Sequence, residues 1–426
     1  MADRAALEER FAGMRDRTVR LGERPKPATG GVTFLPEPGR QPRHWPIIST
    51  DDHVVEPAHL FEGRVPRHLA DRAPRVVETE DGNQQWVFDG RPQASLGLAA
   101  VVGRPLEEAF EPTRFDHMRR GAWDPAHRVR DMDLNGIYAS LNFPSGLGGF
   151  AGQRLQLGVD EDLALAVVRA WNDWYLEEWV QAHPGRFVGS QLAWLRDPVQ
   201  AGEEVRRNAE RGVRAVAFTE GPAQLGLPGL HGDHWDPFLR ACEETGTVVC
   251  LHVGSASTPP EPSPGAPFET VGVLFAAHAL FYAVDWLFSG IPVRFPDLRI
   301  CMSEGGIGWV ASLLDRLDHM QRYQVIYGTW PSAEVTPAEA LRRNFYFCAI
   351  NDPTAFRTLD RIGEDHVTVE SDYPHLDSLW PHTQAVLHDQ LAHLPAEVAA
   401  KVAWRNASEL FGHEVPTQFV EDPDAF

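Results

Sequence analysis

The chain has 426 residues, 43% of them hydrophobic, which is enough to bury a large core without disulfides. Its 60 acidic residues outnumber the 39 basic ones, and the net charge of −21 repels the phosphate backbone of nucleic acids and anionic membrane surfaces. We therefore expect a small-molecule substrate, and neither nucleic acid nor membrane, as the partner of this protein.

The two ends of the chain look like extensions of a central domain. Residues 1–20 mix acidic and basic side chains and lack an apolar run, so they predict a short amphipathic helix and not a secretory signal. Residues 24–46 are rich in Pro and Gly, which is typical of an arm that lies on another surface. We therefore place residues 1–45 outside the core and treat residues 412–426 as a C-terminal tail.

From residue 46 onward, eight short apolar runs alternate with segments of helical periodicity. The runs are residues 46–53, 138–143, 186–192, 214–220, 248–254, 299–306, 345–348 and 366–374. Eight β-then-α units in a row predict an α/β chain folded as a closed (β/α)8 (TIM) barrel over residues 46–411. An open doubly wound sheet is the alternative, but no glycine-rich dinucleotide-binding motif follows the first run.

The segment from residue 54 to residue 137 is too long for a simple crossover, so we expect an insertion after the first strand. Residues 75–90 predict a β-hairpin with its turn at Asp81 and Gly82, and the rest of the insertion predicts a lid over the barrel mouth. Arg114, Arg119 and Arg120 in this insertion are candidates to clamp a substrate carboxylate, although a solvated surface position is the commoner role of an arginine.

Residues 271–288 form an apolar stretch nearly long enough to span a bilayer. His278 and Asp285 interrupt this stretch, and it lies between two strand-like runs. We therefore predict a helix that is buried or faces another subunit. Together with the N-terminal arm, this helix indicates a homodimer.

The four cysteines show no closely spaced pairs, and three of them fall in apolar strand-like runs. They are Cys242, Cys250, Cys301 and Cys348. Free thiols in such runs behave as small hydrophobic side chains, so a reducing, cytoplasmic setting is the simplest interpretation.

Polar side chains end four of the eight strand-like runs, at the barrel face where active sites lie. The candidates are Asp51, His53, His252, Glu304 and Asp372. Because side chains alternate along a strand, Asp51 and His53 point to one side and Asp52 to the other. Buried carboxylates that converge in this way are costly unless a cation neutralises them. Although each residue alone has a common structural explanation, such as a helix cap or a core histidine, the joint pattern predicts a divalent metal centre.

The motifs around these residues resemble the amidohydrolase-related superfamily, in the branch typified by aminocarboxymuconate-semialdehyde decarboxylase. The likeness runs from about residue 46 to residue 411 and rests on four motifs: ISTDDHVVEP, LHVGS, FPDLRICMSEGGIGW and ESDYPH. Members of this family bind a catalytic metal through His-x-His on strand 1, a His on strand 5 and an Asp on strand 8, and a strand 6 His often acts as acid or base. The resemblance implies His53, His252 and Asp372 as ligands.

Two positions depart from that family pattern. Asp51 stands where the first His is expected, as in carboxylate variants of the family, and Glu304 stands where the strand 6 His is expected. The second replacement removes the imidazole that shuttles protons, which puts ordinary decarboxylation or hydrolysis in doubt. Glu304 and Asp372 are then candidates both to bind metal and to act in catalysis, and His375 is a further candidate ligand or proton carrier.

The chemistry of the candidate ligands favours iron over zinc. Zinc hydrolase sites favour His with one carboxylate, whereas two His with several carboxylates suit ferrous iron and oxygen chemistry. The chain is also similar to the non-haem iron diterpenoid hydroxylases of platensimycin-type biosynthesis, which are amidohydrolase-like barrels. That resemblance implies one or two Fe(II) ions, with Glu304 as a bridge, that hydroxylate a bulky apolar, diterpenoid-like carboxylic acid in secondary metabolism.

Aromatic residues near the expected mouth fit a bulky apolar substrate, although a core position is the commoner one for such side chains. They include Trp86, Trp123, Phe143, Trp309, Tyr373 and Trp380. Of these we expect Phe143, Trp309 and Tyr373 to contact substrate. Two alternatives to the hydroxylase are a Zn- or Mn-dependent decarboxylase or hydrolase, in which Glu304 or Asp372 moves the proton, and a barrel that has lost catalysis and only binds.

Overall fold

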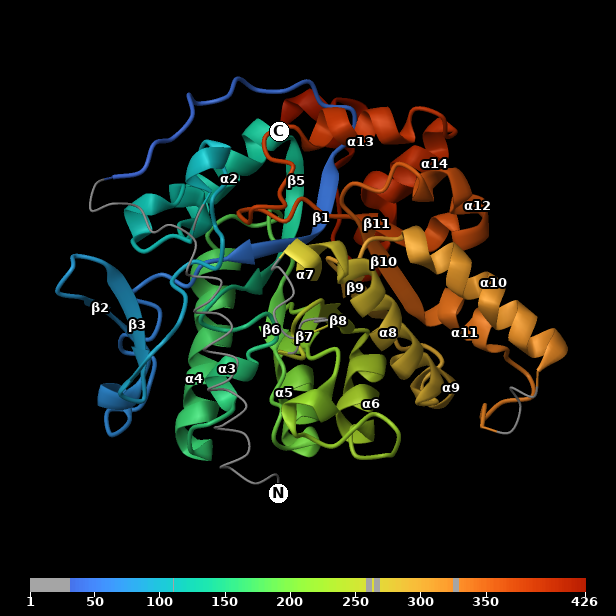
Figure 1. The fold of residues 1–426 in the computed structure, drawn as a ribbon, viewed down its shortest axis with the longest axis horizontal. Coiled ribbons are helices and arrows are strands. Elements are labelled where there is room, and N and C mark those ends of the chain that lie inside the picture. The colour runs from blue at the N-terminus through green and yellow to red at the C-terminus, as the bar shows by residue number, and fades with distance from the viewer. Residues whose placement is uncertain (1–30, 110, 258–262, 264–268, 325–328) are drawn as a thin grey trace.

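The computed structural model describes residues 31–109, 111–257, 263, 269–324 and 329–426. The amphipathic helix expected in residues 1–20 lies outside this part of the chain. Among the described residues, eight strands form one parallel sheet (Figure 1). They are β1 (Ile47–Val54), β5 (Ile137–Pro144), β6 (Ser190–Leu192), β7 (Ala215–Phe218), β8 (Val248–His252), β9 (Ile300–Ser303), β10 (Phe345–Ala349) and β11 (Val367–Val369). Each strand overlaps one of the eight predicted runs, and β1, β5 and β10 extend one residue beyond theirs at one or both ends.

The sheet curls into a nearly closed barrel. Its order is β5-β1-β11-β10-β9-β8-β7-β6, so the two outer strands are consecutive in the chain. The segment just before β6 closes most of the gap, because the Ser140 amide donates to the Arg186 carbonyl (3.1 Å) and the Val188 amide donates to the Ser140 carbonyl (2.9 Å). The structure therefore confirms the (β/α)8 barrel and excludes the open doubly wound sheet.

Helices surround the strands, as the sequence periodicity predicts (Figure 1). The longer ones are α2 (Pro125–Asn135), α4 (Glu161–Trp174), α5 (Pro198–Glu210), α6 (Asp236–Thr245), α8 (Phe275–Phe288), α10 (Gly308–Tyr323), α11 (Pro337–Asn344) and α13 (Thr383–Leu391). Shorter ones are α3 (Gln153–Gln156), α7 (Glu269–Val273), α9 (Ile291–Arg294), α12 (Leu359–Ile362), α14 (Ala396–Ala400), α15 (Asn406–Phe411) and α16 (Thr417–Glu421). Side-chain caps help to determine where helices begin. At the first turn of α5, for example, the Asp197 carboxylate accepts from the amides of Val199 (2.8 Å) and Gln200 (3.1 Å).

The apolar stretch 271–288 forms the end of α7 and all of α8. His278, Tyr282 and Trp286 lie on the buried face of α8, whereas Phe281 is 62% exposed on the other face. In the described part of the chain, no helix combines the length and the hydropathy needed to cross a membrane. The buried face is as expected, and contact of the outer face with a second subunit stays a prediction.

The insertion after β1 contains the expected hairpin. β2 (Arg75–Glu78) pairs antiparallel with β3 (Gln84–Phe88), which also pairs with the short β4 (Arg91–Pro92). Gly82 has φ 78° in the turn, a left-handed conformation that favours glycine. This small sheet stands at the flank of the barrel (Figure 1).

The three candidate arginines of the insertion form ion pairs within the insertion, its helix α2 and the arm. Arg114 pairs with Asp116 and Glu78, and Arg120 lies 3.5 Å from Asp124. Arg119 pairs with Asp131 of α2 and, at 3.1 Å, with Glu37 of the arm. Their expected role as substrate clamps stays a prediction.

Candidate metal centre

The five candidate ligands lie at the carboxyl ends of four strands. Asp51 and His53 belong to β1, His252 is the last residue of β8, Glu304 follows β9, and Asp372 follows β11. The side chains of all but Glu304 are fully buried, and that of Glu304 is 11% exposed. The barrel thus brings together residues that are more than 300 positions apart.

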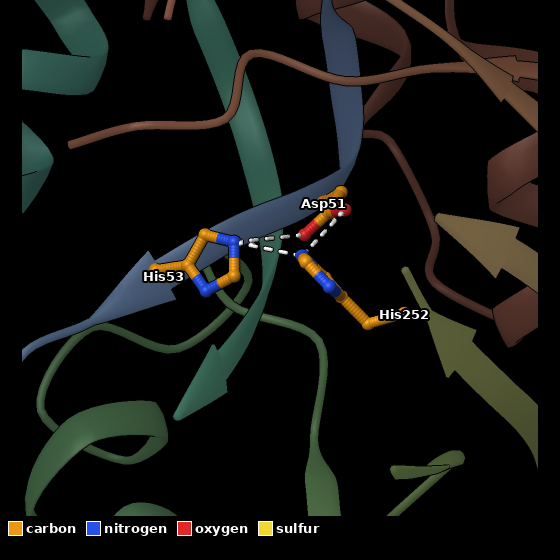
Figure 2. Close-up of side chains that lie close together, drawn as sticks. All are labelled: Asp51, His53 and His252. Carbon is orange, nitrogen blue, oxygen red and sulfur yellow. Dashed lines mark hydrogen bonds and ion pairs between the residues drawn. The ribbon is translucent and has the colours of Figure 1, made fainter. Parts of the chain in front are cut away.

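Two imidazoles and one carboxylate converge most closely, and Figure 2 shows their polar atoms pointing toward one another. The Nε2 atoms of His53 and His252 are 3.1 Å apart. His53 Nε2 lies 3.5 Å from Asp51 Oδ1, and His252 Nε2 lies 3.4 Å from Asp51 Oδ2. This is the spacing of ligands around a single ion.

The hydrogen bonds of the imidazoles leave both Nε2 atoms free to bind metal. His252 Nδ1 lies 2.7 Å from the Val253 carbonyl, and His53 Nδ1 lies 3.4 Å from the Pro144 carbonyl. Since a carbonyl only accepts, each Nδ1 carries the proton and each Nε2 carries a lone pair. Burial lowers the pKa of His53 to about 4 and that of His252 well below its ordinary value, so both rings are neutral. The lone pairs of the two Nε2 atoms repel each other unless a cation lies between them, and a metal ion bound by both atoms would remove this repulsion.

A second group of three side chains shares His53. Asp372 Oδ1 lies 3.3 Å from His53 Nε2 and 3.0 Å from His375 Nδ1. The rings of His53 and His375 stack at 3.8 Å, and His375 Nε2 lies 3.3 Å from Ser145 Oγ. Burial alone would raise the pKa of Asp372, but the neighbouring His375 outweighs it and holds that pKa below its ordinary value. His375 therefore lies beside the candidate ligands, and its role as a ligand or proton carrier stays a prediction.

The remaining carboxylates crowd the same space without a counter-ion among the described residues. Glu304 Oε2 lies 3.5 Å from His252 Nε2, and neither oxygen of Asp51 accepts a hydrogen bond. Burial first, and then the neighbouring carboxylates, raise the pKa values of Asp51 and Glu304 well above their ordinary range, and burial is also the main cause of the raised pKa of Glu370. A divalent cation removes this repulsion, so the donor set fits a metal ion of this kind.

The sequence interpretation missed Glu370. One of its oxygens accepts from the Glu304 amide at 3.0 Å, and its other oxygen is buried without a hydrogen bond. The predicted run 366–374 offered a signal, because alternation along an extended segment would put Glu370 on the same side as Asp372, although β11 itself ends at Val369.

The interpretation also missed Phe150, for which the sequence carries no comparable signal. Its ring stacks on His252 at 4.0 Å and meets His53 edge-on at 5.2 Å. Phe150 lies in the glycine-rich segment 145–152 and has φ 64°. Gly148 of that segment donates to Glu56 Oε1 at 3.1 Å, and a side chain there would come within 2.5 Å of Pro144. A backbone of this kind places a phenyl ring over a metal-facing imidazole.

The three aromatic residues expected to contact substrate lie in different surroundings. Phe143 is buried beside the site, with its ring 5.1 Å from that of His252. Trp309 donates to the Gly305 carbonyl (3.0 Å) and packs on Phe347. The Tyr373 hydroxyl donates to Asp131, and its ring packs near Trp380. Phe143 is thus the one of the three whose contacts reach the imidazoles, and substrate contact by each stays a prediction.

Comparison with known proteins identifies the family. The family model described as Amidohydrolase (Amidohydro_2) matches residues 58–413, which is well over half of the chain. The chain belongs to this amidohydrolase family. Asp51 and His53 lie just before the matched segment, and His252, Glu304 and Asp372 lie within it.

Two curated relatives of this amidohydrolase are decarboxylases by name. The chain is 25% identical over 283 residues to 2-amino-3-carboxymuconate-6-semialdehyde decarboxylase of Dictyostelium discoideum, an alignment of 61% of this chain and 69% of that protein. It is 24% identical over 273 residues to gamma-resorcylate decarboxylase of Rhodococcus jostii (strain RHA1), an alignment of 58% of this chain and 76% of that protein.

Solved structures share the fold of this amidohydrolase. An amidohydrolase of Mycobacterium avium subsp. paratuberculosis K-10 has a TM-score of 0.68 and 21% identity, and the match covers 86% of this chain and 99% of that one. A dihydroxybenzoic acid decarboxylase of Polaromonas sp. JS666, solved with bound manganese and the inhibitor 2-nitroresorcinol, has a TM-score of 0.60 and 18% identity, covering 88% of this chain and 99% of that one.

These findings confirm the expected barrel, its amidohydrolase family and a metal-dependent enzyme class. They favour the decarboxylase alternative over the expected iron hydroxylase, because the curated relatives are decarboxylases. A divalent metal is supported, and the expected Fe(II) is not confirmed.

Proposed function

We propose that this amidohydrolase is a decarboxylase of a small carboxylic acid that depends on a divalent metal, Mn²⁺ or Zn²⁺. The observation that carries the proposal is the convergence of two neutral imidazole Nε2 atoms and the Asp51 carboxylate at the mouth of the barrel. The names of the curated relatives support the reaction class. Asp51, His53, His252 and Asp372 would hold the ion, and Glu304 would be a further ligand or a proton carrier.

The bound ion supplies a positive charge that holds the substrate and withdraws electrons from the carbon next to the carboxylate. The side chains supply the rest. When the carbon–carbon bond breaks, carbon dioxide leaves, the bonding electrons stay on the carbon, and a proton must reach that carbon. Glu304 would deliver this proton, and His375, which lies between Asp372 Oδ1 (3.0 Å from Nδ1) and Ser145 Oγ (3.3 Å from Nε2), is a second candidate carrier.

The aromatic rings around the imidazoles keep water from this chemistry. Phe150 covers one face of His252, and Phe143 packs against the same ring. An apolar wall lowers the local dielectric, which strengthens the attraction between an ion and an anionic substrate.

A second candidate is the iron-dependent hydroxylase, and one observation favours it. The site contains two overlapping groups of ligand-type side chains that share His53, and Glu304 and Glu370 add carboxylates beyond them. Such an excess of carboxylates suits one or two Fe(II) ions that hydroxylate an apolar carboxylic acid. The third possibility, a barrel that only binds, requires no redox or proton chemistry at all.

Metal loading under anaerobic conditions distinguishes the decarboxylase, the iron hydroxylase and the barrel that only binds. Protein purified without chelators is analysed for metal content, and chelated protein is reloaded with Mn²⁺, Zn²⁺ or Fe²⁺ and tested on a panel of aromatic and unsaturated acids. The proposal expects carbon dioxide release without oxygen, and its loss in His252→Ala. Oxygen uptake with Fe²⁺ and no anaerobic carbon dioxide would establish the hydroxylase instead. Metal binding with neither product would leave the binding barrel.

A further inference from the structure

Asp52 lies between two candidate ligands of β1 but points away from the metal. Its side chain is fully buried, and Oδ1 accepts three hydrogen bonds, from Ser49 Oγ (2.9 Å), Ser371 Oγ (2.6 Å) and the Tyr373 amide (3.3 Å). Ser371 and Tyr373 are the residues immediately before and after Asp372. One oxygen of Asp52 therefore accepts from both chain neighbours of Asp372, a candidate ligand that follows another strand.

The segment around Asp372 needs such contacts, because β11 ends at Val369 and Asp372 itself has φ 49°, a left-handed conformation that few residues other than glycine adopt without strain. Two backbone hydrogen bonds join it to β1: the Asp372 amide donates to the Asp51 carbonyl (3.0 Å), and the His53 amide donates to the Tyr373 carbonyl (2.7 Å). Asp52 adds side-chain contacts to the same junction.

Arg128 of α2 lies on the same side of this junction and is also fully buried. Its Nη2 donates to the His53 carbonyl, its Nε donates to the Gly121 carbonyl (2.8 Å), and its guanidinium lies 4.4 Å from the centre of the Tyr373 ring. The positive charge of Arg128 attracts the Asp52 carboxylate and partly offsets the cost of its burial. Arg128 therefore touches a ligand residue of β1 and the residue that follows Asp372.

We propose that Asp52 and Arg128 are positioning residues that hold His53 and Asp372 together at ligand distance, and so determine metal affinity without contacting the metal. This inference rests on the metal centre and not on the reaction that the centre performs. Groups behind metal ligands typically change metal affinity by about 10- to 100-fold when they are removed.

The test compares Mn²⁺ dissociation constants of the full-length protein and its variants, measured by titration of chelated protein. We expect Asp52→Ala to weaken Mn²⁺ binding by about 10- to 100-fold, because the neighbours of Asp372 lose their shared acceptor. Asp52→Asn keeps an oxygen that can accept from Ser371 and Tyr373, so its affinity should lie between those of wild type and Asp52→Ala. Arg128→Met should weaken binding in the same direction.

Two further variants separate positioning from general loss of structure. Ser371→Ala removes only one donor to Asp52 and should weaken binding less; since it acts through Asp52, the double variant Asp52→Ala/Ser371→Ala should bind no more weakly than Asp52→Ala alone. Glu204→Gln on α5, which weakens the ion pairs of Glu204 with the partly exposed Arg169 of α4 and with Arg207, is the control for lost stability. It should lower the unfolding temperature of the metal-free protein and leave Mn²⁺ affinity unchanged.

The inference is overturned if Asp52→Ala lowers the unfolding temperature of the metal-free protein but binds Mn²⁺ as tightly as wild type. A double variant that binds Mn²⁺ more weakly than Asp52→Ala, by the loss seen in Ser371→Ala alone, would equally count against it, because Ser371 would then not act through Asp52. A wild-type chain that binds no divalent ion would overturn both this inference and the metal centre beneath it.

Discussion

Replacement of Glu56 by Gln should change how the stability of the protein depends on pH. Glu56 is fully buried two residues after β1, and burial raises its pKa from 4.5 to about 7. The folded protein therefore binds a proton at this group between pH 4.5 and pH 7, where the unfolded chain has released it. Stability linked to Glu56 is present below the unfolded pKa and is lost as the pH rises through the folded pKa.

The size of this effect follows from the two pKa values. One pKa unit corresponds to about 1.4 kcal/mol. The raised pKa of Glu56 should therefore lower the free energy of unfolding by about 3 kcal/mol at pH 8, and by only about 1 kcal/mol at pH 5. Urea unfolding of metal-free wild type and Glu56→Gln at pH 5, 6, 7 and 8 measures the difference. From pH 5 to pH 8, the free energy of unfolding of Glu56→Gln should rise by about 2 to 3 kcal/mol relative to that of wild type. Parallel pH profiles for the two proteins would refute the reasoning.

Two predictions concern side chains around the imidazoles. Phe150→Ala should let a chelator remove Mn²⁺ several-fold faster, because its ring covers one face of His252, whereas Phe281→Ala on the exposed face of α8 should not; equal removal rates in both variants would contradict a covering role. Glu304→Gln should retain Mn²⁺ but lose carbon dioxide release, because an amide cannot carry a proton, and Glu304→His should keep activity. Full activity of Glu304→Gln would exclude proton transfer by that residue.

Most strands of the barrel can be predicted from local sequence patterns. Short apolar runs that end in polar side chains predict both the strands and the face at which they terminate, since parallel strands of a barrel share one direction. Some strands are shorter than the predicted runs: in the run 186–192, for example, β6 begins only at Ser190. Arg186 and Val188 instead form backbone hydrogen bonds with Ser140 of β5, the strand at the other edge of the sheet, and so close the ring.

The metal centre is predictable only in part. Asp51 and His53 can be predicted because residues two apart on one strand point to the same side. The same spacing in the predicted run 366–374 pairs Glu370 with Asp372. Phe150 and the partners of Asp52 carry no such signal. Phe150 reaches His252 through a left-handed backbone that only a folded loop defines, and Asp52 accepts from Ser371, which is more than 300 residues away in sequence. These contacts depend on the closed barrel and not on local pattern.

The most direct test of the metal centre is a titration of chelated wild type and His252→Ala with Mn²⁺, followed by calorimetry. Because His252 contributes a neutral Nε2 that faces the Nε2 of His53 at 3.1 Å, its loss should weaken Mn²⁺ binding by more than roughly 100-fold, beyond the effect of groups that only support the ligands. Equal binding by the two proteins, or no binding by either, would contradict the account.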